Sequence, residues 1–289
     1  MEKHQINFNT ATVHQHGWTF QYPETPSNSG NRLVLLHGAG VAGELTWTYI
    51  CNYLNHWQEI LVVDLAGMGR SEFLTDDDIE VGSFSLQLIE LLEALDWQQF
   101  DMAGYSFGGL VAVDYLSRFY RCSSGRDFGG LLFLIEPAML FSTKIEDLNY
   151  KAHEYASIAL EIANGETHVS VFRRFLDSVS PNRKPNKIAD ELTMQRLCEN
   201  ASGFAAALAV VAKNLVARGE DFVAWRSPFS GISFVGGLSP DVMKVRHQRL
   251  VEQSQDWQLI EVPNSDHSLV FTKPRTIARA MNAKKAEQP

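Results

Sequence analysis

Short, almost continuous hydrophobic runs recur along the chain and predict β-strands that are buried on both faces. Such runs are typical of a parallel sheet covered by helices, whereas a half-exposed strand alternates apolar and polar residues. The six runs are residues 33–36, 60–63, 100–103, 131–135, 232–235 and 259–262. Two further β-rich stretches, residues 6–13 and 18–22, predict an antiparallel pair, and residues 23–30 are rich in Pro, Ser, Asn and Gly and predict a loop.

Helical patterns separate these runs. Over residues 84–95 the apolar positions Phe84, Leu88, Leu91 and Leu95 share one face of a helix, and residues 110–119 show a similar pattern. Alternation of strand and helix predicts right-handed βαβ units and a doubly wound sheet.

The alternation stops between Leu140 and Arg226. This stretch has helical patterns and no convincing strand; Val169, Phe172 and Val179, for example, share one helical face. We interpret residues 140–226 as a helical lid inserted into a core of residues 1–139 and 227–289. The alternative is that these helices only cover the sheet, but a crossover between neighbouring strands rarely needs so many residues.

Composition limits the classes of partner. The 289 residues are 45% hydrophobic and 20% charged, with a formal net charge of −9. These proportions are ordinary for a globular chain, and a negative net charge argues against a nucleic-acid or anionic-membrane partner. The longest apolar stretch, residues 204–211, is too short to span a bilayer.

Cysteine usage and the first residues indicate a reducing, cytoplasmic compartment. The three cysteines, Cys51, Cys122 and Cys198, have no CxxC spacing and cannot all pair within the chain. The N-terminus lacks the basic and apolar regions of a signal peptide. No HExxH, paired CxxC or GxxxxGK[ST] pattern occurs, so we expect neither a metal nor a cofactor. The sequence leaves the oligomeric state open.

A candidate nucleophile stands between a predicted strand and a predicted helix. Residues 104–109 read GYSFGG, which is a G-x-S-x-G pattern centred on Ser106. A tight strand-to-helix turn lifts the serine hydroxyl clear of the backbone and leaves no room for side chains at Gly104 and Gly108. The helix that follows favours developing negative charge at its N-terminus. An ordinary glycine-rich turn is the alternative, but the strand–helix context favours a nucleophile.

With three further segments, the chain resembles the α/β-hydrolase family. Residues 35–40 (LLHGAG) resemble the family's oxyanion loop, residues 64–71 (DLAGMGRS) its D-x-x-G-x-G-x-S loop, and residues 264–268 (NSDHS) its histidine loop. The resemblance implies an α/β-hydrolase fold, with an oxyanion hole formed by the backbone N–H groups of Ala39 and Phe107. It implies that Asp64 and Arg70 hold a loop and have no catalytic role.

The general base is expected at His267. Among nine histidines, His267 alone follows the last predicted strand in a polar turn that can reach Ser106. The serine needs a general base whose pKa lies near neutrality, and an imidazole side chain supplies one.

The acid that orients His267 has two candidates. By the resemblance, an Asp normally follows the seventh strand as G-x-x-D-P, but residues 236–241 here read GGLSPD, which puts Ser239 at that position and Asp241 two residues late. Some relatives keep the acid after the sixth strand, where this chain has Glu136. The alternatives are a solvated loop residue for Glu136 and a helix N-cap for Asp241. We slightly favour Glu136, and Asp266 is a poor third.

The lid is expected to shape an apolar pocket for a small-molecule substrate. The residues expected to bind the substrate are His37, Gly38, Tyr105, Met139, Leu140 and Phe172, and the lid is expected to line the pocket also with Phe141, Phe175 and Phe204. Packing of these aromatic residues among themselves is the alternative. The predicted function is hydrolysis of an ester or thioester. Carbon–carbon bond hydrolysis, perhydrolase chemistry and a ligand receptor on the same fold stay open.

Overall fold

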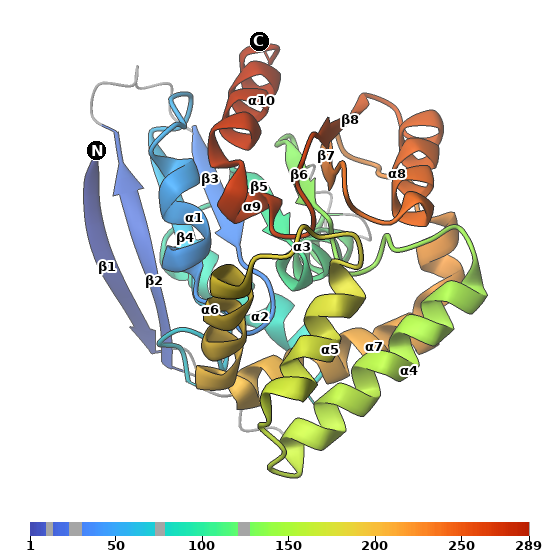
Figure 1. Ribbon diagram of the computed structural model, residues 1–289. Coiled ribbons are helices and arrows are strands. Elements are labelled where there is room, and N and C mark those ends of the chain that lie inside the picture. Colours follow the sequence, from blue (N-terminus) through green and yellow to red (C-terminus); the bar gives the residue numbers. More distant parts are fainter. Residues whose placement is uncertain (10–13, 23–30, 73–78, 121–127, 289) are drawn as a thin grey trace.

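The computed structural model describes residues 1–9, 14–22, 31–72, 79–120 and 128–288. Within them, eight strands form one sheet in the order β1-β2-β4-β3-β5-β6-β7-β8 (Figure 1). The strands are β1 (Glu2–Asn9), β2 (His14–Gln21), β3 (Arg32–Leu36), β4 (Glu59–Val63), β5 (Asp101–Tyr105), β6 (Leu132–Ile135), β7 (Gly231–Gly236) and β8 (Trp257–Val262). The helices are α1 (Gly43–Cys51), α2 (Val81–Ala94), α3 (Phe107–Phe119), α4 (Ile145–Ala163), α5 (Val169–Val179), α6 (Lys187–Glu199), α7 (Ala201–Ala224), α8 (Asp241–Gln253), α9 (Leu269–Thr272) and α10 (Pro274–Ala286).

The strand pairing confirms the predicted fold class. β1 and β2 pair antiparallel, β2 pairs antiparallel with β4, and every pairing from β4 to β8 across the sheet is parallel. Each of the six hydrophobic runs became a strand within two residues of its predicted limits. The N-terminal pair begins about four residues earlier than predicted. Residues 10–13 and the predicted loop at 23–30 lie outside the described residues.

Alternate residues of the central strands enter two separate cores, which explains why both faces of these strands are apolar. On β3, Val34 packs into the core beneath α2 and α3, whereas Leu33 packs into the core beneath α1, α9 and α10. On β4, Leu61 and Val62 divide in the same way. Figure 1 shows α1, α9 and α10 on one face of the sheet and α2 and α3 behind it.

Four helices, α4–α7, fill the chain between β6 and β7, and the described residues of this segment contain no strand. They gather at one end of the sheet (Figure 1). The longest, α7, is long and apolar enough to cross a membrane by length and composition, but 56% of its most apolar window is buried inside the structure. It packs extensively along α4, and its apolar side is therefore used within the protein. The predicted division into a core and a lid stays an interpretation.

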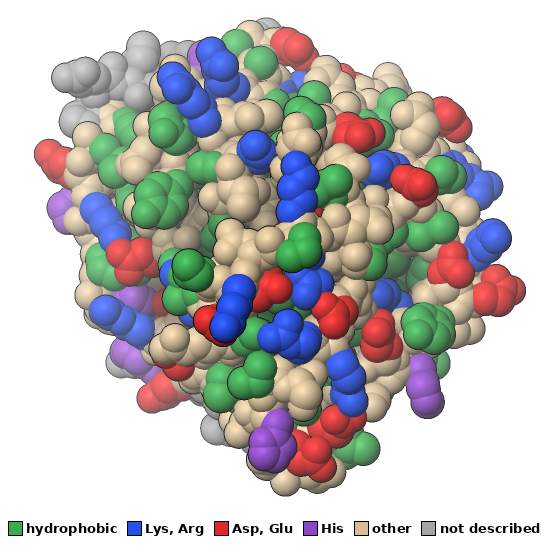
Figure 2. Space-filling view, in the orientation of Figure 1, with side chains coloured by type: hydrophobic (Ala, Val, Ile, Leu, Met, Phe, Trp, Pro, Cys, Tyr) green, Lys and Arg blue, Asp and Glu red, His purple; other side chains and the backbone are tan. Residues whose placement is uncertain are grey.

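The surface carries mixed charge. Figure 2 shows Lys and Arg side chains interspersed with Asp and Glu over the face in view, as several pairs illustrate. This face offers no continuous basic surface of the kind that binds a phosphate backbone.

Candidate active site

Ser106 stands at the sharp turn between β5 and α3. Its backbone has φ 51° and ψ −116°, a conformation that residues with a side chain rarely adopt. The turn is held on both sides, because the Ser106 N–H donates to the Ile135 carbonyl at 3.0 Å and its carbonyl accepts from the Ala138 N–H at 2.9 Å. Such strain persists only where the surroundings fix it, and it is concentrated at functional sites.

The two glycines of the motif are required by close backbone contacts. A Cβ at Gly104 would lie 2.5 Å from the Gly108 carbonyl oxygen. A Cβ at Gly108 would lie 2.4 Å from the Leu36 carbonyl oxygen and 2.5 Å from that of His37. These distances are shorter than any van der Waals contact, so the helix can approach the sheet only with glycine at both positions.

His267 meets Ser106 across the carboxyl edge of the sheet. It lies in the loop between β8 and α9, and its Nε2 is 3.1 Å from the Ser106 Oγ. Tyr105 at the end of β5 holds this loop in place. Its hydroxyl donates to the His267 carbonyl at 3.0 Å, and the centroids of the two rings lie 5.1 Å apart. Burial raises the pKa of Tyr105 well above its ordinary value, so this hydroxyl stays a neutral donor.

Glu136 completes the chain of hydrogen bonds. It follows β6, is fully buried, and its Oε2 lies 2.7 Å from the His267 Nδ1. The other carboxylate oxygen, Oε1, accepts from the Gly236 N–H at 2.7 Å and from the Ser239 hydroxyl. A buried carboxylate needs such partners. The expected site therefore has its serine, histidine and carboxylate in one line of contacts.

The other acidic candidates lie elsewhere. The Asp241 side chain is 94% exposed and pairs with Lys244 at 3.2 Å, so it is not the histidine's partner. Nor is Asp241 an N-cap, because Pro240 takes that position and Asp241 is already the first residue of α8. Asp266 accepts from the N–H and hydroxyl of Ser268 at 2.8 and 2.6 Å, which fixes a local turn.

The loop after β3 lies directly against the serine turn. A Cβ at Gly38 would be 2.9 Å from the Tyr105 ring and 3.3 Å from the Ser106 Cβ. Phe107 is the first residue of α3, so its N–H has no carbonyl one helical turn earlier to bond to. Among the described residues, none accepts a hydrogen bond from the N–H of Ala39 or Phe107. Both donors are therefore available to an oxygen placed near Ser106.

His37 has a structural role in the loop after β3. Its side chain is fully buried, its Nδ1 lies 2.7 Å from the Gly38 carbonyl, and its Nε2 accepts from the Leu65 N–H at 2.9 Å. Burial lowers the pKa of His37, which keeps the ring neutral and able to accept. Both ring nitrogens therefore brace the loop, and His37 is not among the residues that line the cavity next to His267. That His37 borders the substrate stays a prediction.

Asp64 braces the same loop, as the resemblance implied. Its carboxylate accepts from the N–H groups of Gly43 and Arg70 at 2.7 and 3.2 Å and lies 2.9 Å from the His16 Nδ1. It thereby ties together β2, the start of α1 and the loop after β4. The Arg70 side chain points elsewhere, toward Gln5 at 3.4 Å.

A cavity of about 270 Å³ adjoins His267 and opens between α4, α5 and the start of α8. Its remaining lining residues are Phe141, Asp147, Tyr150, Lys151, Tyr155, Ser178, Val179, Pro181, Pro240, Val242 and Met243. Phe141 is the residue of the expected aromatic lining that contacts this cavity. Met139, Leu140 and Phe172 do not line it, so the prediction that they border the substrate fails for this cavity.

The other expected lining residues form an aromatic chain inside the helical segment. Phe172 and Phe204 lie 6.0 Å apart, Phe204 and Phe175 4.8 Å, Phe175 and Tyr155 5.7 Å, and Tyr155 and Phe141 6.0 Å. These five side chains are all less than a tenth exposed. This aromatic chain runs from the loop after β3 to the cavity, because a Cβ at Gly40 would lie 2.9 Å from the Phe204 ring. Phe172, Phe175 and Phe204 therefore pack with one another, and that they also border the substrate stays a prediction.

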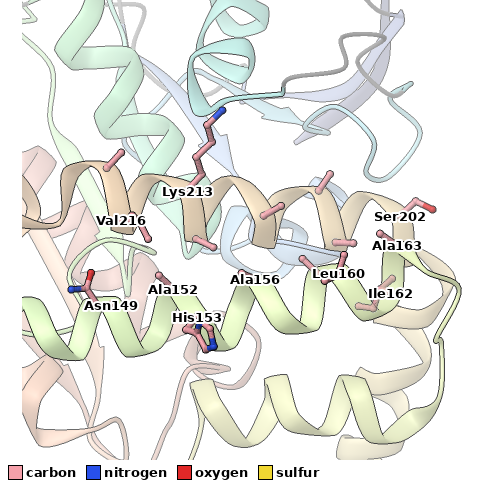
Figure 3. Close-up of a pocket in the computed structure, with 16 residues that line it drawn as sticks. Asn149, Ala152, His153, Ala156, Leu160, Ile162, Ala163, Ser202, Lys213 and Val216 are labelled. Carbon is pink, nitrogen blue, oxygen red and sulfur yellow. The ribbon is translucent and has the colours of Figure 1, made fainter.

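A larger groove of about 970 Å³ lies along α4 and α7, away from these residues (Figure 3). It is lined mainly by alanines such as Ala152, Ala156 and Ala209, with Leu160 and Val216 at its rim. Ser106, His267 and Glu136 do not contribute to it. Its size alone does not make it the catalytic pocket.

Sequence reasoning missed the contacts that hold the carboxylate and the polar residues that line the cavity. Ser239 was recognised only as standing where relatives carry an acid. The signal that could have found its contact is that a buried Glu136 needs donors and Ser239 is a donor one strand away. Asp147, Lys151 and Tyr155 carry no motif, and they meet at the cavity only because α4 passes beside the sheet edge.

Comparisons with known proteins agree with this fold. A model of the "Alpha/beta hydrolase family" matches residues 33–280 of the chain. The match begins at β3 and ends within α10, and it includes Ser106, Glu136 and His267.

Curated relatives match over shorter segments. A putative carbamate hydrolase from Pseudomonas syringae is 34% identical over 82 residues, which is 28% of this chain and 31% of the relative. A 2-hydroxy-6-oxo-2,4-heptadienoate hydrolase from Pseudomonas putida is 29% identical over 93 residues, 32% of this chain and 34% of the relative. The chain thus matches about a third of the length of these relatives.

Solved structures match over the whole chain. A 2-hydroxy-6-oxo-6-phenylhexa-2,4-dienoate hydrolase from Rhodococcus sp. is 17% identical, with a TM-score of 0.70 and 98% of each chain covered. An α/β hydrolase from a Medee basin deep-sea metagenome is 13% identical, with a TM-score of 0.73 and 98% of each chain covered. At these identities the likeness supports the fold alone.

Proposed function

From the premise that this chain belongs to the alpha/beta hydrolase family, we propose that it is a serine hydrolase acting on an ester or thioester of a small, uncharged, largely apolar substrate. One observation carries the proposal: the continuous line from the Ser106 Oγ to the His267 Nε2 at 3.1 Å and from the His267 Nδ1 to Glu136 at 2.7 Å. A hydroxyl, an imidazole and a buried carboxylate in this order are the parts of an activated nucleophile.

The proposed reaction has two steps. Ser106 attacks the substrate carbonyl while His267 takes the hydroxyl proton, and His267 then gives that proton to the leaving alcohol or thiol. Water next attacks the acyl-enzyme with His267 again as base, which releases the acid and restores Ser106. The N–H groups of Ala39 and Phe107 face the developing oxyanion in both steps, and one such donor contributes roughly 3–4 kcal/mol in well-studied enzymes.

Glu136 is proposed to orient His267 and to stabilise its protonated form. Its Oε2 contacts Nδ1, so Nδ1 carries the proton and Nε2 is free to accept one from Ser106. Because Glu136 is fully buried, its interaction with the imidazolium is little screened by water.

The lining of the cavity favours an uncharged substrate. Most of its wall is apolar or aromatic, including Phe141, Val179 and Met243. Among its described lining residues, Lys151 is the sole Lys or Arg, and its ammonium already bonds to Glu154 at 3.1 Å and to the Ser178 hydroxyl at 2.6 Å. Asp147 adds a negative charge to the wall. A substrate carboxylate would therefore meet no free cation there.

Carbon–carbon bond hydrolysis is the second candidate, and the names of the relatives favour it. Two proteins that this chain resembles are dienoate hydrolases, and a dienoate carries a carboxylate. The paired state of Lys151 argues against such a substrate here. If carboxylate-bearing dienoates were nevertheless cleaved, Lys151 would have to leave Glu154, and Lys151→Met would then raise their KM about tenfold or more while leaving esters unaffected.

A panel of p-nitrophenyl esters with acyl chains of two to twelve carbons tests the proposal. We expect turnover that peaks at short to medium chains, because about 270 Å³ holds a small acyl group. Ser106→Ala is expected to lower kcat at least 10⁴-fold. Ser157→Ala is the matched control, because its hydroxyl lies on the exposed face of α4 and donates to Glu161 at 2.9 Å, away from His267 and Ser106.

Two results would contradict the proposal. Turnover that survives Ser106→Ala would show that another group attacks the substrate. Negligible turnover of every ester, together with ligand binding that persists in Ser106→Ala, would instead indicate a receptor on the same fold.

A further inference from the structure

The outer oxygen of Glu136 is held by a side chain that no motif identifies. Its Oε1 accepts from the Ser239 hydroxyl and from the Gly236 N–H at 2.7 Å, while Oε2 is left to His267. Ser239 is 1% exposed, lies in the turn between β7 and α8, and does not line the cavity beside His267. A substrate contact therefore does not explain its placement.

We propose that Ser239 is a positioning residue for the catalytic carboxylate: its hydroxyl fixes the Glu136 rotamer and so holds Oε2 toward His267. This inference rests on the proposed function. By the resemblance, the turn after the seventh strand is where relatives place the acid itself. Here the same turn supplies a donor to an acid that comes from the neighbouring strand.

The turn is built to deliver this hydroxyl. The Ser239 N–H donates to the Gly236 carbonyl at 3.0 Å, which closes a tight turn directly after β7. A Cβ at Gly236 would lie 2.9 Å from the Ser239 Oγ, so glycine leaves the space in which the hydroxyl sits. Pro240 follows and ends the turn at the start of α8. The backbone that carries the hydroxyl is thus fixed before and after Ser239.

Glu136 needs such a donor because its own backbone is strained and its side chain is fully buried. Its φ is 41°, a left-handed value that is uncommon for a residue other than glycine. With Ser239 and Gly236 on Oε1 and His267 on Oε2, the carboxylate has a partner on each oxygen. Without the hydroxyl, one backbone N–H remains to hold the outer oxygen of a buried charge.

The titratable groups around Glu136 determine how the pH dependence of the rate can be interpreted. His267 faces it from the loop after β8, Tyr105 from β5 and Tyr155 from α4, with Asp266 nearby. Burial raises the pKa of both tyrosines, so neither titrates near neutrality. A change in the acid limb of the rate profile is therefore not caused by either tyrosine.

The test compares Ser239→Ala, Ser239→Thr and Ser233→Ala in the full-length protein with p-nitrophenyl butyrate. Ser239→Ala is expected to lower kcat about 10- to 100-fold, the effect of losing a hydrogen bond to a charged group, with KM unchanged. Its acid limb of kcat/KM should move to higher pH, because the lost hydrogen bond stabilised the unprotonated carboxylate.

The other two variants are matched controls. Ser239→Thr keeps the hydroxyl and should recover most of the rate. Ser233 is also fully buried on β7, but its hydroxyl accepts from the Trp257 indole at 3.2 Å and does not contact Glu136. Ser233→Ala should therefore leave the acid limb where it is. If Ser239→Ala does not fold, Ser239→Cys, which keeps the volume and weakens the donor, takes its place with the same expectations.

A fluorophosphonate probe separates the inference from the proposed function. Its labelling rate measures the nucleophilicity of Ser106 without a turnover substrate, and Ser239→Ala should slow it while Ser233→Ala does not. Wild-type kcat, labelling and pH profile in Ser239→Ala, beside a Glu136→Gln variant that is impaired, would overturn the positioning role alone. An unimpaired Glu136→Gln would overturn the proposed triad itself.

Discussion

The carboxyl edge of the sheet and the helix α8 beside it both bury a histidine, but they treat it in opposite ways. At the sheet edge, His267 has Glu136 on one ring nitrogen and Ser106 on the other. On α8, His247 is fully buried, and within the described part of the chain neither of its ring nitrogens has a hydrogen-bond partner. Burial and the neighbouring Arg246 lower the pKa of His247 to about 3.

The contrast between His267 and His247 distinguishes buried polar groups that can take part in catalysis from buried polar groups that lower stability. A buried group with a complete set of partners is held in one orientation, as general base catalysis requires. A buried group without partners loses its hydration and gains nothing in return. Substitutions in the two regions should therefore act on different quantities: on rate at the sheet edge, and on the free energy of unfolding in the helices.

The largest effect is expected at the acid. Glu136→Gln should lower kcat about 10³- to 10⁴-fold, because the amide no longer stabilises the imidazolium and can hold the ring in the wrong tautomer. Steady-state kinetics on p-nitrophenyl butyrate measure the change. The melting temperature should stay close to that of the wild type, so that the lost rate does not reflect unfolding. Asp241→Asn is the matched control, because its exposed carboxylate pairs only with Lys244, and its rate should stay within about twofold of wild type. The reverse ranking would transfer the acid's role to Asp241.

A stability effect is expected from the aromatic chain in the helical segment. Phe172 is 1% exposed and packs against Phe204, so Phe172→Ala should lower the free energy of unfolding by about 3–5 kcal/mol. Urea denaturation measures the loss. The preferred acyl-chain length should not change, since Phe172 does not line the cavity beside His267.

Val242→Phe sharpens the same contrast. Val242 lines the cavity and is 48% exposed, so a larger side chain there should shorten the preferred acyl chain with little change in stability. A changed chain preference in Phe172→Ala with unchanged stability would restore Phe172 as a substrate contact.

How far the sequence could predict this molecule depends on whether an interaction is local. The serine turn could be predicted because its strand, its glycines and its helix lie within a few residues of Ser106. The position of His267 could be predicted because the parallel strand order brings the loop after β8 to the carboxyl edge of the sheet, where Ser106 lies. The choice between Glu136 and Asp241 could not be predicted, because it depends on side-chain directions in two turns. These turns are in contact although they lie about 100 residues apart in the sequence.

The substrate contacts were the least predictable part of the site. Aromatic residues on helical faces suggested a lining, but the same residues also fill the core between α4, α5 and α7, and the sequence does not distinguish these uses. Phe172, Phe175 and Phe204 pack with one another, whereas the cavity is bordered by residues such as Tyr150 and Val242 that no pattern singled out. The motif predicted the position of His37 beside the serine, but the sequence could not show which backbone groups its ring nitrogens contact.

The smallest of the expected effects tests the unpaired histidine. In the unfolded chain His247 takes up a proton below pH 6.5, but in the folded protein it does so only near pH 3. The unfolded state therefore gains stability as the pH falls between these values, by about 1.4 kcal/mol per pH unit, which is roughly 2 kcal/mol between pH 6.5 and 5. His247→Leu removes this proton uptake, so in urea denaturation the variant should gain on the wild type by about that amount between pH 7.5 and pH 5. His153→Gln, at an exposed position on α4, should follow the wild type at both pH values. If His247→Leu loses stability with pH as steeply as the wild type, His247 must have a partner in solution, and the contrast with His267 would no longer hold.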